Sequence, residues 1–467
     1  MTRSHLAAVL TAAAVLLVAC RSRVSPSGEG GAASSGVPGA GGAPPSAAAA
    51  EPSAPPPDEA EIARLADDLV NLYGPTVSMA MLSLSHAGPA AVPELTRRLQ
   101  SADVNMRYRA LIVLGRIGDR SAEAAIRALL DDPNEQVRVS ARIALLRFGA
   151  REELPSLLDL ARTPDPPALR AAALSGLATL RVEEALPAFR EGIRAREPDV
   201  RYWAIQGLRA LEDRASAGEL VTLLCDPNAT VAAAAADALR ALGSASTHAD
   251  VAKAFAAAKG EQRALVLELL RDLAHPDLAT FVRQAVADDA PAVRAVAMCL
   301  APRAAPDAAS ALEWLGAGSR DASATVRSLA LRGLGLVGGE AATSILARAL
   351  FDEDPFCRYN ACAGLARAGA ADKAGDLEKL ESGDGVLIVR GAAREARARL
   401  GVWSAVEGLV ADLDDGILSA AARAALADLF AEDLGPFASV WREKVLDRGA
   451  GAYRYDGELR RFVPKAG

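Results

Sequence analysis

Aromatic residues are rare in this chain: they make up 4% of its 467 residues, although hydrophobic residues make up 51%. Much of that hydrophobic content is alanine, which is the best helix former and a poor strand former. The chain therefore has enough apolar surface for a core, and its composition favours closely packed helices over sheets.

An excess of positive charge is also missing. The net charge is −7, only 6 of the 52 basic residues are lysine, and the arginines are spread along the chain. Binding to nucleic acid would need a basic patch or stripe. The sequence therefore predicts no nucleic-acid partner.

Catalytic and metal-binding motifs are absent as well. The chain has no CxxC or HExxH motif and no pair of histidines with the spacing of metal ligands. His86, His248 and His275 fall in different units of the chain, and we expect them to lie far apart. The sequence predicts neither a metal site nor a cofactor, and it argues against an enzyme.

The N-terminus has the features of an export signal. Arg3 precedes a 14-residue apolar run over residues 6–19, which is shorter than the roughly 20 residues that a membrane-spanning helix needs and indicates a signal peptide over residues 1–19. The closing LVAC resembles the lipobox of bacterial lipoproteins, which implies lipid attachment at Cys20; the alternative is a plain secretory signal with a chance cysteine. Arg21 stands where enterobacterial lipoproteins of the inner membrane carry aspartate, so we expect the outer membrane of a Gram-negative cell envelope.

Residues 20–58 follow as a linker. Ala, Gly, Ser and Pro occupy 31 of the 38 positions from 21 to 58, so this segment cannot build a packed core. We expect a flexible tether that holds the folded part clear of the lipid surface.

The rest of the chain repeats a pattern built around one arginine. In VRYWAIQGL (residues 200–208), apolar residues stand one place before Arg201 and three, four and seven places after it, which is one face of a helix. The pattern recurs every 29–33 residues, a period that indicates a solenoid of stacked units. The anchor positions are Arg107, Arg138, Arg170, Arg201, Ala232, Arg263, Arg294, Arg327, Arg358 and Arg390, with weaker copies at Ser78 and Ser419.

Each unit is expected to be a helical hairpin. A first helix, such as residues 122–130, ends in a turn such as DDPN, and the second helix carries the anchor. Asn134 and Asp354 stand where an N-cap is needed. In four units a proline precedes the anchor by three places, in the first helical turn, where it is tolerated; these are Pro167, Pro198, Pro291 and Pro355.

The D-P-x-x-x-V-R turn and the A-L-x-x-L-G that follows it resemble the short bacterial HEAT repeats called PBS-lyase HEAT-like. The resemblance covers residues 59–430 and implies an all-α, right-handed α-solenoid (an armadillo/HEAT-like superhelix) of about 11–12 helical hairpins. In that family the anchor arginine commonly bonds to acidic turn residues of the same or the next unit. Asp132, Asp226 and Asp352 are the candidates here, whereas Ala232 lacks the arginine.

Residues 431–467 depart from the repeat and are expected to form a C-terminal cap. Gly435 and Trp441 resemble the closing segment of many bacterial HEAT-like proteins. Residues 452–462 predict a small hairpin with a two-residue turn at Asp456-Gly457. A cap is needed because the last unit would otherwise expose its stacking face.

Known enzymes of the family do not match this chain. Its metal hydroxylases bind iron through repeated His-Glu dipeptides, and this chain has none. Its phycobilin lyases attach a tetrapyrrole, which suits an exported protein poorly. Its DNA glycosylases need a basic concave face with aromatic residues.

The second helices are expected to line the concave face of the solenoid. Positions one, two and five after each anchor point away from the core, and aromatic residues among small ones suit an extended peptide or another folded protein. Tyrosine after the anchor could equally pack against the neighbouring unit, but Trp203 has no aromatic counterpart in the other units. The candidate protein-binding residues are Tyr108, Arg109, Tyr202, Trp203, Gln206, Arg332, Tyr359 and Asn360, and Val139, Ser140 and Ile143 occupy the same positions.

The remaining tryptophans and cysteines are expected in the core. Helix and stacking geometry places the possible cysteine pairs roughly 8 Å or more apart, beyond the reach of a disulfide. This expectation covers Trp314, Trp403 and Trp441, and Cys225, Cys299, Cys357 and Cys362.

Two functions stay open. The leading hypothesis is an envelope-anchored, noncatalytic scaffold that gathers protein partners and is held at the membrane by its N-terminal lipid. The alternative is an enzyme or ligand-binding accessory of the PBS-lyase HEAT-like family whose site the sequence does not reveal.

Overall fold

The computed structural model describes residues 58–70 and 75–465. The chain divides into two units, residues 1–56 and 57–467. The predicted signal peptide, Cys20 and the linker as far as residue 57 lie outside the described residues.

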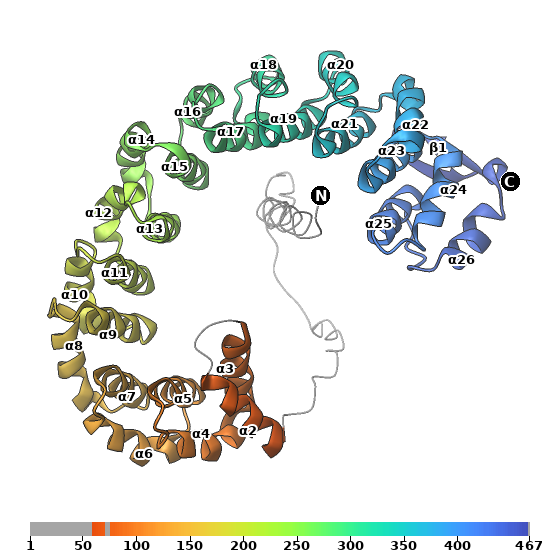
Figure 1. The fold of residues 1–467 in the computed structure, drawn as a ribbon. Coiled ribbons are helices and arrows are strands. Elements are labelled where there is room, and N and C mark those ends of the chain that lie inside the picture. The colour runs from red at the N-terminus through yellow and green to blue at the C-terminus, as the bar shows by residue number, and fades with distance from the viewer. Residues whose placement is uncertain (1–57, 71–74, 466–467) are drawn as a thin grey trace, which may run out of the picture. The chain divides into compact units, whose positions relative to one another are not determined.

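The second unit is a stack of helix pairs, in which each even-numbered helix packs against the odd-numbered helix that follows it (Figure 1). The odd-numbered helices carry the anchors and lie on the inner side of the stack, as Figure 1 shows. The first helices of the pairs are α2 (Glu59–Asp67), α4 (Val92–Arg98), α6 (Glu123–Arg127), α8 (Leu154–Arg162), α10 (Leu186–Gly192), α12 (Ala217–Thr222), α14 (His248–Ala257), α16 (Leu278–Val286), α18 (Ala308–Gly318), α20 (Glu340–Ala349), α22 (Ala374–Gly383) and α24 (Trp403–Asp412). The second helices are α3 (Pro75–Ala87), α5 (Val104–Ile117), α7 (Glu135–Arg147), α9 (Pro167–Thr179), α11 (Pro198–Ala210), α13 (Ala229–Leu242), α15 (Gly260–Asp272), α17 (Pro291–Ala304), α19 (Ala324–Val337), α21 (Pro355–Ala368), α23 (Leu387–Arg399) and α25 (Ser419–Phe430). This is the right-handed α-solenoid that the repeat predicts.

The second helices begin where the sequence signals predict. Helices α9, α11, α17 and α21 each start with proline. Asn134 and Asp354 cap α7 and α21, and each side chain accepts two backbone N–H groups of the first turn. Because the first N–H groups of a helix have no partner within the helix, a proline or a capping side chain removes or satisfies them.

Small residues let neighbouring helices approach each other closely. Ala204, three places after its anchor, is fully buried, like its counterparts in most units. Gly207 of α11 lies against the ring of Phe189 in α10, where a Cβ would stand 2.3 Å from a ring carbon. Between α19 and α21, a Cβ on Gly335 would stand 2.7 Å from the Cα of Gly364. Alanine, leucine and glycine thus build the stack, in agreement with the scarcity of aromatic residues.

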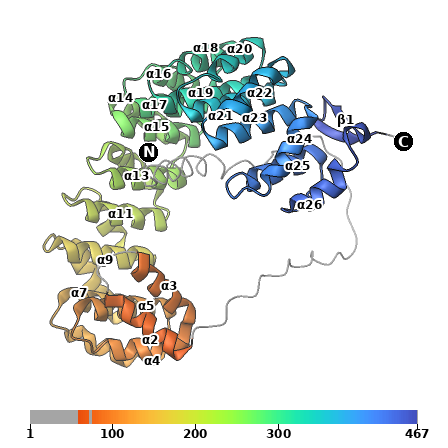
Figure 2. The same ribbon diagram turned by 45° about the vertical axis from the view of Figure 1, so that its right-hand side comes forward.

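The C-terminal cap, in contrast, is rich in aromatic residues. The ring of Trp403 in α24 stacks on that of Tyr453 with centroids 5.5 Å apart, and the ring of Phe430 in α25 stacks on that of Phe462 with centroids 5.6 Å apart. These contacts bury the open end of the last helix pair. The elements of the cap are α26 (Ala438–Trp441), a π-helical turn (Arg442–Leu446), β1 (Tyr453–Asp456) and β2 (Arg461–Pro464), seen from a second side in Figure 2.

The two residues that resemble the family's closing segment contact each other. The indole Nε1 of Trp441 donates to the carbonyl oxygen of Gly435 at 2.9 Å. Gly435 has a φ of 87°, a left-handed conformation that glycine adopts without strain. Trp441 is fully buried, Trp314 is 7% exposed and Trp403 is half-buried, so the core prediction is confirmed for the first two.

The C-terminal hairpin is confirmed, but its predicted two-residue turn is wrong. Asp456 pairs with Arg461, so residues 457–460 form a four-residue loop. The carboxylate of Asp456 accepts the backbone N–H groups of Glu458 and Leu459. This local bonding stabilises the longer loop and moves Gly457 out of the predicted turn.

Candidate binding surface

The anchor arginines connect neighbouring units, and Arg201 shows how. Its Nη1 donates to the carbonyl oxygens of Ala195 and Arg196 in its own turn, at 2.9 and 2.6 Å. Its Nε and Nη2 donate to the two carboxylate oxygens of Asp226 in the next turn, both at 2.7 Å. Asp226 also accepts the N–H of Asn228 at 2.8 Å. One buried arginine therefore clamps two consecutive turns through charge-assisted bonds.

The same clamp recurs along the chain, and we call the set of pairs the arginine ladder. It confirms the acidic partners Asp132, Asp226 and Asp352 that the family resemblance implied. The guanidinium of Arg294 holds the pKa of Asp321 below its usual range, because the hydrogen bonds that it donates outweigh the effect of burial. The pairs are Arg107–Asp132, Arg201–Asp226, Arg263–Asp288, Arg294–Asp321, Arg327–Asp352 and Arg358–Asp384.

The ladder is interrupted between α7 and α15. Arg138 bonds within its own unit, to the carbonyl oxygen of Asp132 at 2.8 Å and to the exposed Glu135 at 3.1 Å. Arg170 reaches Glu191, whose side chain is 61% exposed. Neither arginine clamps a buried aspartate of the next turn: the turn after Arg138 carries Asp165, which is exposed, and the turn after Arg170 has no aspartate.

At Ala232 the anchor arginine is missing, and a glutamine of the next unit bonds in its place. Most anchor arginines donate to the carbonyl oxygen six residues earlier in the chain, as Arg201 does. For Ala232 that oxygen belongs to Asp226, and Nε2 of Gln262 donates to it at 2.6 Å. Gln262 therefore satisfies the turn that the absent arginine would otherwise hold.

Tyr202 and Trp203 form an aromatic pair on α11, a helix of the inner row. Their rings meet edge to face, with centroids 5.1 Å apart and an interplanar angle of 81°, a favourable geometry for two aromatic side chains. Both are half-buried and pack against the core of the stack. They therefore combine anchoring in the core with a part that stays open to solvent.

Two other predicted binding residues connect neighbouring segments of the stack. Nη1 of Arg109 donates to the carbonyl oxygen of Leu69 at 2.6 Å. Nδ2 of Asn360 donates to the hydroxyl of Ser328 in the preceding unit at 2.7 Å. Each of these side chains has a structural role whether or not a partner binds.

The other predicted binding residues differ in exposure. Tyr108 is half-buried and packs against the core, whereas Tyr359 is 40% exposed. Gln206 and Arg332 are half-buried. The carbonyl of the Gln206 side chain accepts Nη2 of Arg209 at 2.8 Å.

For α7 the expected concave positions are wrong. Val139 and Ser140 are 2% and 6% exposed, and the Ser140 hydroxyl donates to the carbonyl oxygen of Gln136 within the helix. Ile143 occupies the space that a side chain at Gly176 of α9 would fill, since a Cβ there would stand 2.5 Å from it. Val139 and Ser140 are thus buried, and Ile143 is half-buried against α9.

The expectation that the histidines lie far apart is wrong for one pair. The rings of His248 and His275, in adjacent units, have centroids 5.0 Å apart. Nδ1 of His275 accepts the N–H of Asp277 at 3.0 Å. Burial lowers the pKa of His275, and the charge of the nearby His248 lowers it further. Their separation of 27 residues is close to the repeat period, which is why the stack brings them together.

The described residues hold no group of three or more His, Cys, Asp or Glu side chains arranged to bind a metal ion. Cys225, Cys357 and Cys362 are free thiols. Burial raises the pKa of both Cys357 and Cys362 to about 12. These two thiols therefore stay protonated and act as small apolar packing groups.

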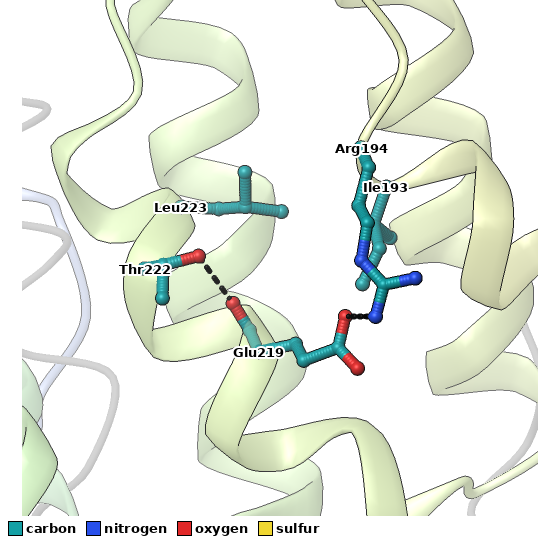
Figure 3. Close-up of a pocket in the computed structure, with 5 residues that line it drawn as sticks. All are labelled: Ile193, Arg194, Glu219, Thr222 and Leu223. Carbon is teal, nitrogen blue, oxygen red and sulfur yellow. Dashed lines mark hydrogen bonds and ion pairs between the residues drawn. The ribbon is translucent and has the colours of Figure 1, made fainter.

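A hollow of about 360 Å³ lies between α10 and α12, on the row of first helices (Figure 3). Arg194 and Glu219 face each other across it, with Nη2 and Oε2 2.6 Å apart. The Thr222 hydroxyl donates to the backbone carbonyl of Glu219. The polar groups of this hollow satisfy one another, so it offers no arrangement for catalysis.

A second hollow, of about 370 Å³, lies where α21, α23 and α25 meet the C-terminal loop. We call it the Tyr359 groove. Sequence reasoning identified Tyr359 but missed the arginines of the groove, which are Arg367, Arg399 and Arg460. Arg367 and Arg399 each stand nine places after the anchor of their unit, so the register could have shown that they are neighbours. Arg460 belongs to the cap, which lies outside the repeat, so the repeat register could not have placed it beside them.

No helix in the described part of the chain has the length and apolar character that crossing a membrane requires.

The search of curated proteins gave no match.

Among solved structures, the chain resembles large helical solenoids. Kap95p, in a structure that concerns its binding to RanGDP, is 13% identical with a TM-score of 0.53, over 86% of this chain and 59% of that one. The karyopherin Kap121p bound to the extreme C-terminus of the protein phosphatase Cdc14p is 13% identical with a TM-score of 0.53, over 78% of this chain and 51% of that one. This chain thus spans between half and three-fifths of the length of those proteins, and the likeness shows the fold alone.

A family model described as HEAT repeats matches residues 92–178, 186–262 and 312–398, which together exceed half of the chain. The matched segments carry most of the helix pairs and four of the six pairs of the arginine ladder. The chain belongs to the HEAT-repeat family.

Proposed function

We propose that this protein is a noncatalytic scaffold that binds protein partners on the inner side of its HEAT-repeat solenoid. The observation that carries the proposal is the pair Tyr202 and Trp203, two large aromatic side chains in edge-to-face contact, of which Trp203 has no aromatic counterpart at its position in the other units. Half-buried aromatic residues held in a fixed geometry are typical anchors of protein interfaces. Kap121p, which has a related fold, binds the extreme C-terminus of Cdc14p, so a stack of this kind is able to hold an extended segment.

The proposal includes a location. The lipobox-like LVAC and the linker that follows it support a lipoprotein attached through Cys20 to the outer membrane of a Gram-negative envelope, with the solenoid held away from the lipid. Replacing Cys20 by serine is expected to move the protein from the membrane fraction to the soluble fraction. Continued labelling of the Cys20→Ser variant by a radioactive fatty acid would refute the anchor.

The alternative is an enzyme or ligand-binding accessory. It is the weaker candidate, because the described residues hold no group arranged to bind a metal ion, and Cys357, the thiol that lies beside Asp352 of the ladder, is buried with its pKa raised to about 12. A cofactor detected by metal analysis of the purified protein, or a tight small-molecule ligand in a thermal-shift screen, would favour this alternative.

The scaffold is tested by crosslinking in envelope fractions, comparing wild type with Trp203→Ala. The matched control is Phe351→Ala, because Phe351 is 74% exposed and lies outside the inner row. We expect Trp203→Ala to lose crosslinked partners that the wild type and Phe351→Ala both retain. An identical set of partners in all three proteins, with equal melting temperatures, would contradict Trp203 as an anchor.

A further inference from the structure

The Tyr359 groove differs from the rest of the inner side in its charge. The whole chain carries a net charge of −7, and the arginines of the ladder are neutralised by aspartates. The groove collects three arginines, Arg367, Arg399 and Arg460, against two carboxylates, Glu395 and Asp428. The local balance is therefore positive in an otherwise acidic protein.

The two carboxylates of the groove are already paired. Nε of Arg399 lies 2.8 Å from Oε1 of Glu395, and its Nη1 lies 2.5 Å from Oδ2 of Asp428. Asp428 has a second cation, Arg461, at 3.8 Å. Two guanidinium groups thus balance two carboxylates and leave the other arginines of the groove uncompensated.

Arg367 and Arg460 are those uncompensated cations. In the described part of the chain neither forms an ion pair, and both are exposed. One N–H of the Arg460 guanidinium donates to the backbone carbonyl of Arg367 at the end of α21. A guanidinium has five N–H donors, so Arg460 is oriented by this bond while most of its donors stay available to a ligand.

The backbone of the C-terminal loop holds Arg460 in this position. Arg460 has a φ of 54°, a left-handed conformation that residues other than glycine rarely adopt. In strand β1 of the same hairpin, the Tyr455 hydroxyl donates to the carbonyl oxygen of Arg399 at the end of α23. The cap is thus tied to α21 and α23 at two points, and its loop forms one wall of the groove.

The floor of the groove is apolar and shallow. Tyr359, 40% exposed, stands beside it. The floor consists of four alanines, Ala363, Ala366, Ala392 and Ala396. Small side chains leave room for the apolar side chain of a ligand, and two nearby cations suit its carboxylates.

We propose that the Tyr359 groove binds an acidic, extended segment of a partner protein. Carboxylates of the segment pair with Arg367 and Arg460, and an intervening apolar side chain lies on the alanine floor beside Tyr359. A peptide suits the groove better than nucleic acid does, since two uncompensated cations cannot follow a phosphate backbone. The proposal rests on the proposed scaffold function, but it uses side chains far along the chain from Trp203, so either can fail alone.

The test uses the full-length purified protein and the fluorescence anisotropy of a fluorescein-labelled decapeptide of alternating glutamate and alanine. We expect binding that weakens steeply when salt is raised from 50 to 300 mM, and at least about tenfold weaker binding of the same peptide with glutamine for glutamate, as expected for loss of charge-assisted bonds. Arg367→Ala and Arg460→Gly are each expected to weaken binding about tenfold. Arg454→Ala, on the same hairpin but outside the groove, is the matched control and should bind like wild type.

Arg460→Gly separates the loss of binding from the loss of folding. Glycine accepts the positive φ at this position without strain, so the variant is expected to melt no lower than wild type while it binds more weakly. No anisotropy change with wild type at millimolar peptide, or equal binding by Arg460→Gly, would overturn the proposal. Equal competition by a single-stranded 20-nucleotide DNA would overturn the preference for peptide.

The same variants distinguish the two proposals. Loss of acidic-peptide binding in Arg460→Gly, together with crosslinked partners unchanged by Trp203→Ala, would support the groove and contradict Trp203 as an anchor. Partners lost in Trp203→Ala, with no binding of the acidic peptide to wild type, would support the scaffold and overturn the groove.

Discussion

Two stretches of the solenoid are built from the same repeat but are held together differently. From α15 to α21 every anchor is an arginine paired with a turn aspartate, and four consecutive pairs run from Arg263–Asp288 to Arg358–Asp384, whose aspartate lies in the turn before α23. From α7 to α13, Arg201–Asp226 is the single pair of this kind. Both stretches bury alanine and leucine in the same register.

The difference shows that the stack forms without a continuous arginine ladder, which adds a polar connection between turns where it is present. A clamp that bonds two turns resists their separation. Where it is missing, the apolar contacts, single hydrogen bonds such as that of Gln262 and ion pairs outside the ladder such as Arg190–Asp213 oppose local opening. We therefore expect the stretch from α7 to α13 to open more readily than the stretch from α15 to α23. Trp203 lies in the first stretch and the Tyr359 groove adjoins the second.

Acid is expected to remove the difference in local opening between the two stretches, and this is the largest of the predicted effects. The pKa values of Asp321, Asp352 and Asp384 are lowered in the folded chain. At Asp321 the main cause is the hydrogen bonds from Arg294. At Asp352 and Asp384 burial raises the pKa, but the hydrogen bonds from arginine and from backbone N–H groups outweigh it. Their contribution to stability is complete above about pH 4, the unfolded value, and is lost as the pH falls through the lowered values. Hydrogen exchange at pH 5 and pH 3, with labelling times scaled to the intrinsic rate, should show α15–α23 losing its extra protection. Unchanged relative protection at pH 3 would contradict a stabilising ladder.

A single broken clamp comes next in size. Arg327 bonds to Asp352 through two nitrogens and to the carbonyl oxygens of Asp321 and Ala322. Arg327→Ala leaves a buried carboxylate without its cation, which costs about 3 kcal/mol of the free energy of unfolding. Arg170→Ala is the matched control in the interrupted stretch and should cost about 1 kcal/mol. Urea denaturation followed by circular dichroism checks this, and equal losses would show that the ladder adds nothing specific.

The substitute bond of Gln262 should matter less than a full clamp. Gln262→Ala leaves the carbonyl oxygen of Asp226 without its donor, and we expect a loss of about 1 kcal/mol. Gln284→Ala, at an exposed position of α16, is the control and should be neutral. Hydrogen exchange should increase at the contact between α13 and α15 in the first variant, and equal behaviour of the two would contradict the substitution of Gln262 for the missing arginine.

The smallest expected effect is a response to mild acid at the border of the two stretches. The pKa of His275 is lowered by burial and by His248, so the neutral form is favoured in the folded chain. Its contribution is complete above about pH 6.5, the unfolded value, and is lost as the pH falls through the lowered value. Hydrogen exchange at pH 7.5 and pH 5.5 should increase around α14–α16 and not in α19–α23. His275→Phe should abolish this response, and a response that persists in the variant would assign it to other groups.

The sequence alone predicted the helix pairs and their caps, and its resemblance to the family implied three of the six ladder partners. These features depend on short spacings: a proline at the first turn, an asparagine before α7, and an aspartate about 25 residues after an anchor. A repeat turns such spacings into three-dimensional neighbours, because each unit stacks on the next in the same orientation. The candidate surface was predicted less well, since Val139 and Ser140 are buried and the arginines of the Tyr359 groove were missed.

By itself, the sequence determined the period, the face of each helix that enters the core and the solenoid that follows, because regular spacing of alanine, leucine and arginine leaves one way to bury the apolar stripe. Only the tertiary structure decided three other features: the contact of His248 with His275, the use of Gln262 where Ala232 lacks an arginine, and the approach of Arg460 to the end of α21, 93 residues earlier in the chain. The first two join residues of adjacent units, which the repeat brings near each other without specifying contact, and the third joins residues that no repeat relates. These contacts depend on how closely two units pack or on where the cap folds back onto the stack. The packing distance and the position of the cap are set by the sum of many contacts and not by the identity of the contacting residues.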